Sequence, residues 1–125
     1  MDFKNGTIIV DGEAFGPKYS FERFKKSPFY KNQDGIRFIH LDGKKEIQGR
    51  KYIVTLFFRN DIIYMISLVC CDFNFTPENE KERKNVHDQI LNAYAINNEK
   101  KFHWGKITSE YDQRSNLSSI NIIYN

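Results

Sequence analysis

The chain has 125 residues, of which 40% are hydrophobic, 28% charged and 15% aromatic, and its formal charge is +3. This length predicts one globular domain, 1–125, and excludes two full domains or a doubly wound nucleotide-binding enzyme. Eleven Phe and seven Tyr residues argue against intrinsic disorder. A charge of +3 carried by scattered Lys and Arg residues does not by itself imply a nucleic-acid ligand.

The sequence carries no sign of secretion or of a membrane-spanning segment. Its first residues lack a basic segment followed by an apolar one. The longest apolar-rich stretch, Ile62–Val69, is too short to cross a bilayer. The adjacent Cys70 and Cys71 would form a strained disulfide, so free thiols in a reducing compartment are expected. We therefore expect a soluble, cytoplasmic protein, and the richness in Asn, Lys and Ile indicates a low-GC bacterium or a mobile element.

The N-terminal part of the chain predicts a strand followed by a short aromatic helix. Thr7–Val10 is rich in β-branched residues and ends at an Asp-Gly turn signal. Six aromatic residues then gather between positions 15 and 30. One or two helical turns are expected at Ser20–Lys26, with Ser20 as the N-cap and Pro28 as the stop.

The middle of the chain predicts further strands and a central hairpin. Ile36–Leu41 is the next expected strand, and Lys44–Gln48 is either a short return strand or a loop. The strongest local signal is the pair of apolar runs Tyr52–Phe58 and Ile62–Val69, which flank Asn60-Asp61.

A two-residue loop in this hairpin would place Arg59 opposite Ile62 and Leu56 opposite Met65. In that register Leu56 and Ile66 are buried on opposite faces of the sheet. Both faces of the hairpin are apolar, whereas the strands of a hairpin that is solvated on one side alternate between apolar and polar residues. We therefore expect a helix on one face and other cover, or a partner, on the second.

A long helix is expected at about 77–95. Thr76 can cap it, Pro77 suits the first helical position, and Glu78 complements the helix dipole. The first two turns, through Asn85, are almost wholly polar and should project into water. The expected apolar stripe consists of Val86, Ile90, Ala93 and Tyr94, with Leu91 beside them.

The last block predicts two strands, Phe102–Ile107 and Ser119–Tyr124, joined around Asp112–Asn116. Ile120, Ile122 and Tyr124 should face the core by alternation. The predicted fold is α+β: a mostly antiparallel sheet of about five to six strands, one long helix packed on one face, and a short N-terminal aromatic helix.

No catalytic or metal-binding motif is evident. The three histidines, His40, His87 and His103, show neither an HExxH motif nor an i,i+4 pair, and the cysteines do not form CxxC. No metal and no cofactor are expected, and each histidine is interpreted as a surface or strand-edge residue. The sharpest enzymatic alternative is a metal-independent nuclease that uses His40 or His103 with Lys, Arg and Glu on a sheet face.

A nucleic-acid-binding module is the other alternative. Basic and aromatic residues are interleaved at Lys100–Lys106, and aromatic side chains on a sheet can stack on bases. The spacing of glycine and aromatic residues that marks RNP motifs is absent. Trp104 is therefore interpreted as a core residue.

The favoured hypothesis is a non-enzymatic interaction protein. Its concrete form is a bacterial immunity-type protein that neutralises a toxin by occluding it, a task that needs only a stable scaffold with a matched surface. The partner is expected to be a protein, with a homodimer through an exposed sheet face or edge as a further option. The candidate binding residues are the helix residues Glu78, Glu80 and Glu82 and the loop residues Asp112 and Arg114.

Overall fold

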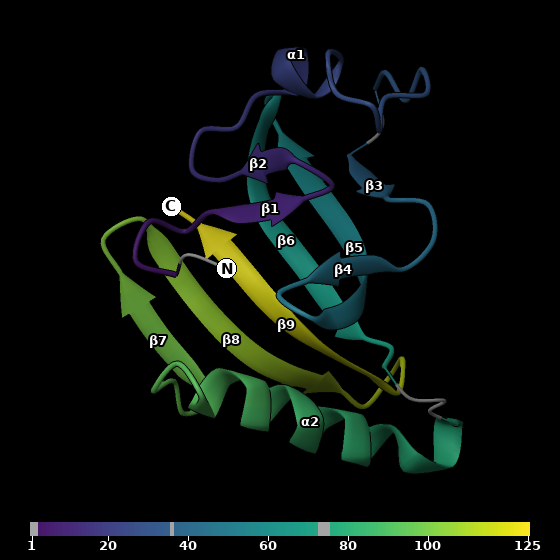
Figure 1. Ribbon diagram of the computed structural model, residues 1–125, viewed down its shortest axis with the longest axis vertical. Coiled ribbons are helices and arrows are strands. Elements are labelled where there is room, and N and C mark those ends of the chain that lie inside the picture. The colour runs from purple at the N-terminus through teal and green to yellow at the C-terminus, as the bar shows by residue number, and fades with distance from the viewer. Residues whose placement is uncertain (1–2, 36, 73–75) are drawn as a thin grey trace.

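A seven-stranded antiparallel sheet forms the centre of the structure, a computed structural model that describes residues 3–35, 37–72 and 76–125 (Figure 1). Its strands are β3 (Phe38–His40), β4 (Lys45–Ile47), β5 (Arg50–Arg59), β6 (Ile62–Cys70), β7 (Glu99–Phe102), β8 (Gly105–Asp112) and β9 (Leu117–Tyr124). They follow the order β3-β5-β6-β9-β8-β7, and β4 pairs with β5 beside β3. The predicted α+β class is confirmed, with more strands than the five to six expected.

The N-terminal part of the chain forms a separate strand pair and a short helix. Strands β1 (Ile8–Val10) and β2 (Glu13–Phe15) are antiparallel and lie in front of the large sheet in Figure 1. Helix α1 (Phe21–Phe24) follows. The side chain of Ser20 accepts a hydrogen bond from the Arg23 N–H at 3.1 Å, so the expected N-cap is confirmed, although the helix is shorter than predicted.

One face of the large sheet is covered and forms the core. Helix α2 (Glu80–Asn92) packs against β9, β8 and β6, and runs along the lower end of the sheet in Figure 1. The strand pair β1–β2 and helix α1 contribute to the same apolar cluster. The most completely buried members of this cluster include Ile8, Phe15, Leu56, Ile66, Leu68, Leu91, Ile107 and Ile120.

The central hairpin is present, but its register differs from the prediction. Asn60 and Asp61 form the two-residue turn with positive φ angles of 52° and 63°, and Arg59 lies opposite Ile62 as expected. A β-bulge then shifts the pairing by one residue, because Tyr64 has no partner of its own on β5. Leu56 consequently pairs with Ile66, so the prediction that these side chains lie on opposite faces is wrong.

Other strand predictions were partly correct. Of the expected strand 36–41, residues 38–40 form β3, and Ile36 lies outside the described residues. The open choice for 44–48 is resolved as strand β4. The expected strand 102–107 is interrupted by a turn at His103-Trp104, which joins β7 to β8. On β9, the residues predicted to face the core, Ile120, Ile122 and Tyr124, are buried.

The long helix also differs in its ends and in its buried face. It begins with a 3₁₀ turn, η1 (Pro77–Asn79), and α2 ends at Asn92. Its buried residues are Glu80, His87, Ile90 and Leu91, whereas Ala93 and Tyr94 are exposed. Positions 80, 87 and 91 share one side of a helix, since they are seven and four residues apart. The polar first turn therefore does not project wholly into water.

Hydrogen bonds join the two ends of the chain. The Trp104 Nε1–H donates to the carbonyl oxygens of Phe3 at 2.9 Å and Lys4 at 3.1 Å. The Tyr124 hydroxyl donates to the Gly6 carbonyl at 2.7 Å. Residues 3–6 are thereby fixed beside the end of β9 and the turn that precedes β8. Trp104 is buried, as expected, although it lies in a turn rather than in a strand.

Candidate binding surface

The second face of the large sheet has no helix or strand packed on it within the part of the chain that the structure describes. We call it the open face. Its side chains alternate with those of the core along each strand. One cross-strand row on it, from β3 to β9, consists of Phe38, Phe57, Met65 and Ile123. Two further apolar side chains, Ile53 and Val69, are paired across β5 and β6.

Large apolar side chains on the open face are exposed to solvent. Phe38 is 50% exposed, and Ile53 and Leu117 are each 43% exposed. None of these three residues is among the binding residues predicted from the sequence. The sequence does indicate an apolar surface of this kind, because both faces of the predicted hairpin are apolar and only one of them can pack against the core. The binding residues predicted from the sequence are instead charged side chains at the helix start and near the β8–β9 turn.

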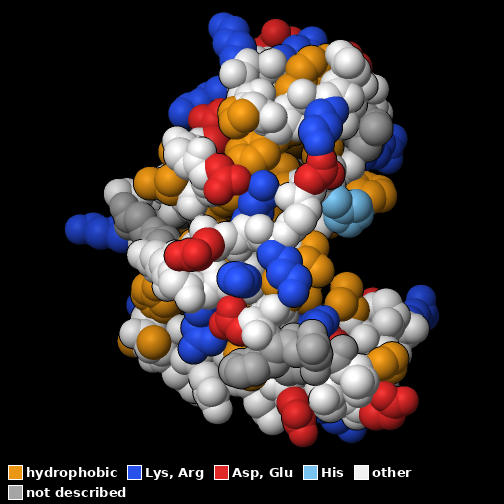
Figure 2. Space-filling view, turned by 45° about the vertical axis from the view of Figure 1, so that its right-hand side comes forward, with side chains coloured by type: hydrophobic (Ala, Val, Ile, Leu, Met, Phe, Trp, Pro, Cys, Tyr) orange, Lys and Arg blue, Asp and Glu red, His pale blue; other side chains and the backbone are white. Residues whose placement is uncertain are grey.

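A hollow of about 400 Å³ lies in the apolar part of the open face. Its apolar lining consists of Phe38, Ile53, Phe57, Val69 and Leu117. In Figure 2 hydrophobic atoms border the place where the outline of the molecule is hollowed between its upper and lower parts. We call this feature the apolar hollow.

The aromatic side chains beside the apolar hollow form a continuous row. The rings of Phe38 and Phe57 are 6.1 Å apart, and those of Phe57 and Tyr64 are 6.0 Å apart. The Arg59 guanidinium lies 4.3 Å from the centre of the Tyr64 ring. These contacts hold the exposed rings in defined positions, which favours a pre-formed surface.

Two basic side chains line the apolar hollow, and one of them, Arg83, is ion-paired with Glu80. The polar lining of this hollow includes His40 and Arg83 and, among the described residues, no Asp or Glu. Nδ1 of His40 is 2.8 Å from the hydroxyl oxygen of Thr55, a contact that orients the imidazole ring. Lys51 is exposed on the same face, two positions before Ile53 on β5, and the exposed Glu46 of β4 is its cross-strand partner.

A second hollow of about 390 Å³ adjoins the apolar one and shares Phe57, Ser67 and Leu117 with it. Its other lining residues are Met65 on β6 and a mostly polar set from β8, β9 and the turn between them. The Glu110 carboxylate there accepts hydrogen bonds from Thr108, at 2.9 Å, and from Asn121. The open face is therefore apolar towards β3 and polar towards β8.

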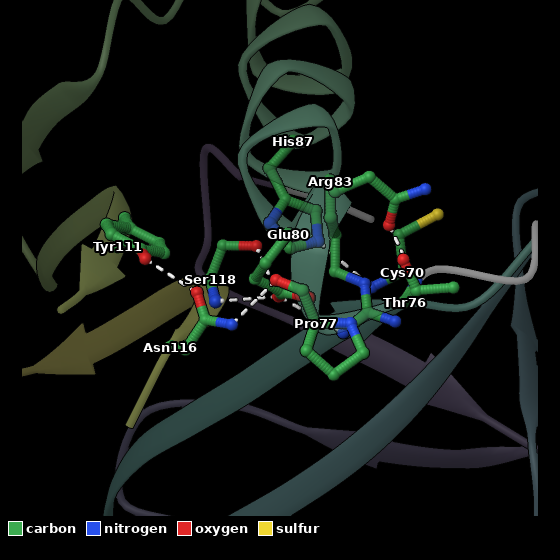
Figure 3. A network of polar contacts seen from close by, with 10 residues as sticks. Cys70, Thr76, Pro77, Glu80, Arg83, His87, Tyr111, Asn116 and Ser118 are labelled. Carbon is green, nitrogen blue, oxygen red and sulfur yellow. Dashed lines mark hydrogen bonds and ion pairs between the residues drawn. The ribbon is translucent and has the colours of Figure 1, made fainter. Parts of the chain in front are cut away.

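The structure brings the two predicted binding segments together at one end of the molecule. Glu78 and Glu82 are exposed at the start of the helix, Asp112 is exposed at the end of β8, and Arg114 is exposed in the turn that follows. The Asn116 side-chain amide donates to the Pro77 carbonyl at 2.8 Å and so ties the turn to the helix start (Figure 3). These four residues remain available to a partner at the margin of the open face.

Glu80, the fifth predicted binding residue, is buried, and its assignment to the surface is wrong. Its Oε1 accepts hydrogen bonds from the Ser118 N–H at 2.9 Å and from the Ser118 hydroxyl at 3.0 Å. The Arg83 guanidinium lies 3.2 Å from the same oxygen (Figure 3). A carboxylate is stable at 5% exposure only with such partners, so Glu80 serves to fix α2 on β9.

His87 is also buried, which contradicts its interpretation as a surface or strand-edge residue. It is 0% exposed, and its Nε2 accepts a hydrogen bond from the Cys70 N–H at 3.0 Å (Figure 3). Burial, assisted by the positive charge of Arg83, lowers the pKa of His87 to about 4. The imidazole is therefore neutral at physiological pH, with its proton on Nδ1. Its Nε2 serves as the hydrogen-bond acceptor for the backbone N–H of the last residue of β6.

The two histidines of the nuclease alternative lie far apart in the sheet. His40 is on β3 and His103 is in the turn after β7, and these strands are at opposite ends of the strand order. Both side chains are exposed. The basic and aromatic segment 100–106 comprises most of β7, the turn at His103-Trp104 and the start of β8, and Trp104 is buried.

His40 does line another hollow, of about 410 Å³, together with Asp11 and Asp42. Both carboxylates are engaged by lysines: Asp11 pairs with Lys45 at 3.0 Å, and Asp42 pairs with Lys31. A predicted catalytic histidine thus shares a hollow with two carboxylates. Ion pairing of both carboxylates leaves neither one placed as a free general base.

Both cysteines are free and buried, and burial raises the pKa of the Cys70 thiol, which makes it less reactive. The described residues contain no group of three or more His, Cys, Asp or Glu side chains that could hold a metal ion. None of the described helices is long and apolar enough to span a membrane. Comparisons of the chain with protein-family models, curated proteins and solved structures found no match.

Proposed function

We propose that the protein is a non-enzymatic binding protein of the bacterial cytoplasm that acts, like an immunity protein, by covering part of another protein. The open face is the binding surface in this proposal. The observation that supports it most directly is the cluster of large apolar side chains that remain 43–50% exposed there. Such clusters, rimmed by polar residues, are typical of protein-interaction sites.

The layout of the open face suits this task. An apolar centre with aromatic residues can supply the few contacts that dominate the binding energy of an interface. The polar half, around Glu110 and the exposed turn residues Asp112 and Arg114, can form the solvated rim. Glu78 and Glu82 extend the same rim, whereas the buried Glu80 does not.

A metal-independent nuclease is the second candidate, and one observation favours it. His40 shares a hollow with Asp11 and Asp42, as a general acid–base pair would require. Two observations weigh against it. Both carboxylates form ion pairs with lysines, and His103 lies next to β7, at the opposite end of the sheet from β3.

Site-specific photo-cross-linking in the producing cells tests the binding proposal. A photoreactive phenylalanine analogue would replace Ile53 on the open face or, as a matched control, Ile9 on β1, which is 60% exposed. We expect a discrete protein adduct from position 53 and none from position 9. Equal adducts from both positions, or none from position 53 in a folded variant, would contradict the proposal.

A further inference from the structure

A row of polar side chains crosses the open face and divides it into two halves. Its members are consecutive cross-strand partners from β3 to β8: His40, Thr55, Ser67, Asn121 and Thr108. We call it the polar row. On each strand, the residues two positions before and after the polar row point to the same side of the sheet. The upper half of the open face extends from this row to the β5–β6 turn, and the lower half extends to the β8–β9 turn.

Apolar side chains occupy matching positions on the two sides of the polar row. On β5, Phe57 lies above the row and Ile53 below it. On β6, Met65 lies above the row and Val69 below it. A half-turn about an axis along the polar row would therefore place Phe57 over Ile53 of a second copy, and Met65 over its Val69.

The apolar hollow lies mainly in the lower half of the open face. Ile53 and Val69 line it below the polar row, and Leu117, at the start of β9, closes its lower end. The same half-turn brings the large upper side chains Phe57 and Met65 to this place. The hollow of one copy would thus receive side chains of the other copy rather than face another hollow.

The charged side chains of the open face differ in sign between its two halves. Arg59, Lys101 and Lys106 give the upper half a formal charge of +3. The lower half has a formal charge of −2, which comes from Lys51 and three carboxylates, those of Glu46, Glu110 and Asp112. Glu99 lies level with the polar row, beside Thr108. The strand positions of the open face therefore carry no net charge, although the whole chain carries +3.

Some of these charges are partly balanced within one copy. Lys106 is ion-paired with Glu99 at 3.3 Å, and Lys51 is the cross-strand partner of Glu46. Arg83, which reaches the hollow from α2, is ion-paired with Glu80. The side chains of Lys106 and Glu99 are 41% and 48% exposed, so both still act on a surface that approaches them. The difference in sign between the two halves remains after these pairs are counted.

This distribution favours one of the two ways in which the open face can pack on itself. Sheets that pack face to face keep their strands within about 30° of one another. An axis along the polar row makes the strands antiparallel and places the basic upper half of each copy over the acidic lower half of the other. An axis along the strands would place the two basic halves together, which is unfavourable.

We propose that the protein forms a symmetric dimer in which the open face of one copy packs on that of a second copy, with the twofold axis along the polar row. Lys106 then faces Glu110 of the second copy, and symmetry supplies this contact twice. Ser67 and Asn121 lie on the axis and meet their own counterparts. The dimer is a property of the free protein and goes beyond the proposed function. Binding of another protein at the open face would require the two copies to separate.

The area of the open face is sufficient for a reversible dimer. Five strands, from β3 to β8, lie about 4.8 Å apart, and eight residues of a strand extend about 26 Å. The face then measures roughly 600 Å² per copy, or about 1,200 Å² for both, which is the lower end of the range for specific interfaces. We expect a dissociation constant on the order of 1–100 μM.

Sedimentation equilibrium over about 5–500 μM tests whether the dimer forms. The mass should rise from 14.9 kDa towards twice that value as the concentration increases. Ile53→Ser should weaken the dimer by at least about tenfold, because position 53 lies in the apolar centre of the interface. Ile9→Ser is the matched control, since Ile9 is 60% exposed but lies on β1, and it should leave the dissociation constant unchanged.

A charge-swap experiment tests the orientation of the two copies. Lys106→Glu and Glu110→Lys should each weaken the dimer by about 5–10-fold, because each creates two contacts between like charges. An equimolar mixture of the two variants should regain the original affinity within about twofold, since both contacts of a mixed dimer again join opposite charges. Lys26→Glu, at an exposed position after α1, is the control and should not change the affinity.

The proposal is overturned if the protein is monomeric over the whole range, or if Ile53→Ser and Ile9→Ser have the same effect. It is also overturned if the mixture associates no more strongly than the separate variants, whereas recovery in the mixture excludes misfolding as the cause of their losses. Cross-linking from position 53 separates this proposal from the proposed function. An adduct with a different protein, combined with a monomer in solution, would retain the binding function and reject the dimer. An adduct of two copies of this chain alone would support the dimer and contradict the binding function.

Discussion

Leu56 on β5 and Ile66 on β6 are cross-strand partners that point to the same side of the sheet, and both side chains are fully buried. A regular two-residue hairpin would have placed them on opposite sides. Because Tyr64 is an extra residue, Ile66 and Leu68 lie on the same side of the sheet as their partners Leu56 and Val54, which is the core side. The bulge thereby also places Met65, rather than Ile66, on the open face.

Leu56→Ala should lower the free energy of unfolding by about 2–5 kcal/mol, because Leu56 is fully buried in the apolar cluster and its truncation leaves a cavity there. Urea denaturation measures this loss. Ile66→Ala should cost a similar amount, and the double variant should differ from the sum by at least about 0.5 kcal/mol because the two side chains are neighbours. Strict additivity would indicate that they are not in contact.

Glu80→Ala should destabilise the protein by about 2–4 kcal/mol, since the buried Ser118 N–H and hydroxyl lose their acceptor and Arg83 loses this ion pair. Glu82→Ala is the control, because Glu82 lies two residues further along the same helix and is exposed. It should change stability by less than about 0.5 kcal/mol. Thermal and urea unfolding of the two variants would settle the point. Equal effects would mean that Glu80 is a surface residue after all.

His87 should make stability depend on pH between about 4 and 6.5. Its pKa is about 4 in the folded protein and near 6.5 in an unfolded chain, so the unfolded state binds the extra proton in this window. Stability is therefore highest above pH 6.5 and falls as the pH decreases towards 4, by about 3 kcal/mol in total. Unfolding free energies measured at several pH values would show this slope.

The variant His87→Gln removes the titrating group while its amide oxygen can still accept from the Cys70 N–H, so its curve should be flatter than that of the unmodified protein in this window. His103→Gln, at an exposed turn, should keep the full slope. If His87→Gln has the same pH dependence as the unmodified protein, another group is responsible.

Gly105→Ala should destabilise the protein severely, by at least about 3 kcal/mol. Its φ is +152°, and a Cβ atom there would lie 2.0 Å from the carbonyl oxygen of Ile123 on the neighbouring strand. Gly43→Ala is a matched control, because φ is +72° but nothing lies within 4 Å. It should cost only about 1 kcal/mol. Differential scanning calorimetry of both variants would test whether the steric contact, rather than the positive φ, causes most of the loss of stability in Gly105→Ala.

The α+β class, the central hairpin and the start of the long helix could be predicted because their signals are local. Two apolar runs flank a two-residue turn, and Thr76-Pro77 marks a helix start. The bulge at Tyr64 has no signal in the neighbouring sequence. It depends on the packing of Ile66 and the following apolar side chains of β6 in the core. The turn at His103-Trp104 was missed for a similar reason: Trp104 is buried by residues 3–6, about a hundred positions earlier in the chain.

The candidate site was predicted only in outline. Exposed residues at the helix start and in the β8–β9 turn were identified by their polarity, and hydrogen bonding through Asn116 places them together. The burial of Glu80 depends on Ser118, 38 positions away, a relationship that only the folded chain reveals. The open face could be inferred from the apolar character of both sides of the hairpin, but its hollow arises from side chains of four strands and a helix.

The hydrogen bonds from Trp104 to Phe3 and from Tyr124 to Gly6 span 101 and 118 positions of sequence. During synthesis at about 5–20 residues per second, the N-terminal segment therefore remains without these partners for roughly 5–20 s. Phe3, Ile8 and Phe15, which are buried in the finished protein, are exposed to water or to chaperones in that interval. Residues 3–6 thus leave the ribosome long before Trp104 and Tyr124, and they reach their final packing only after these partners have been synthesised.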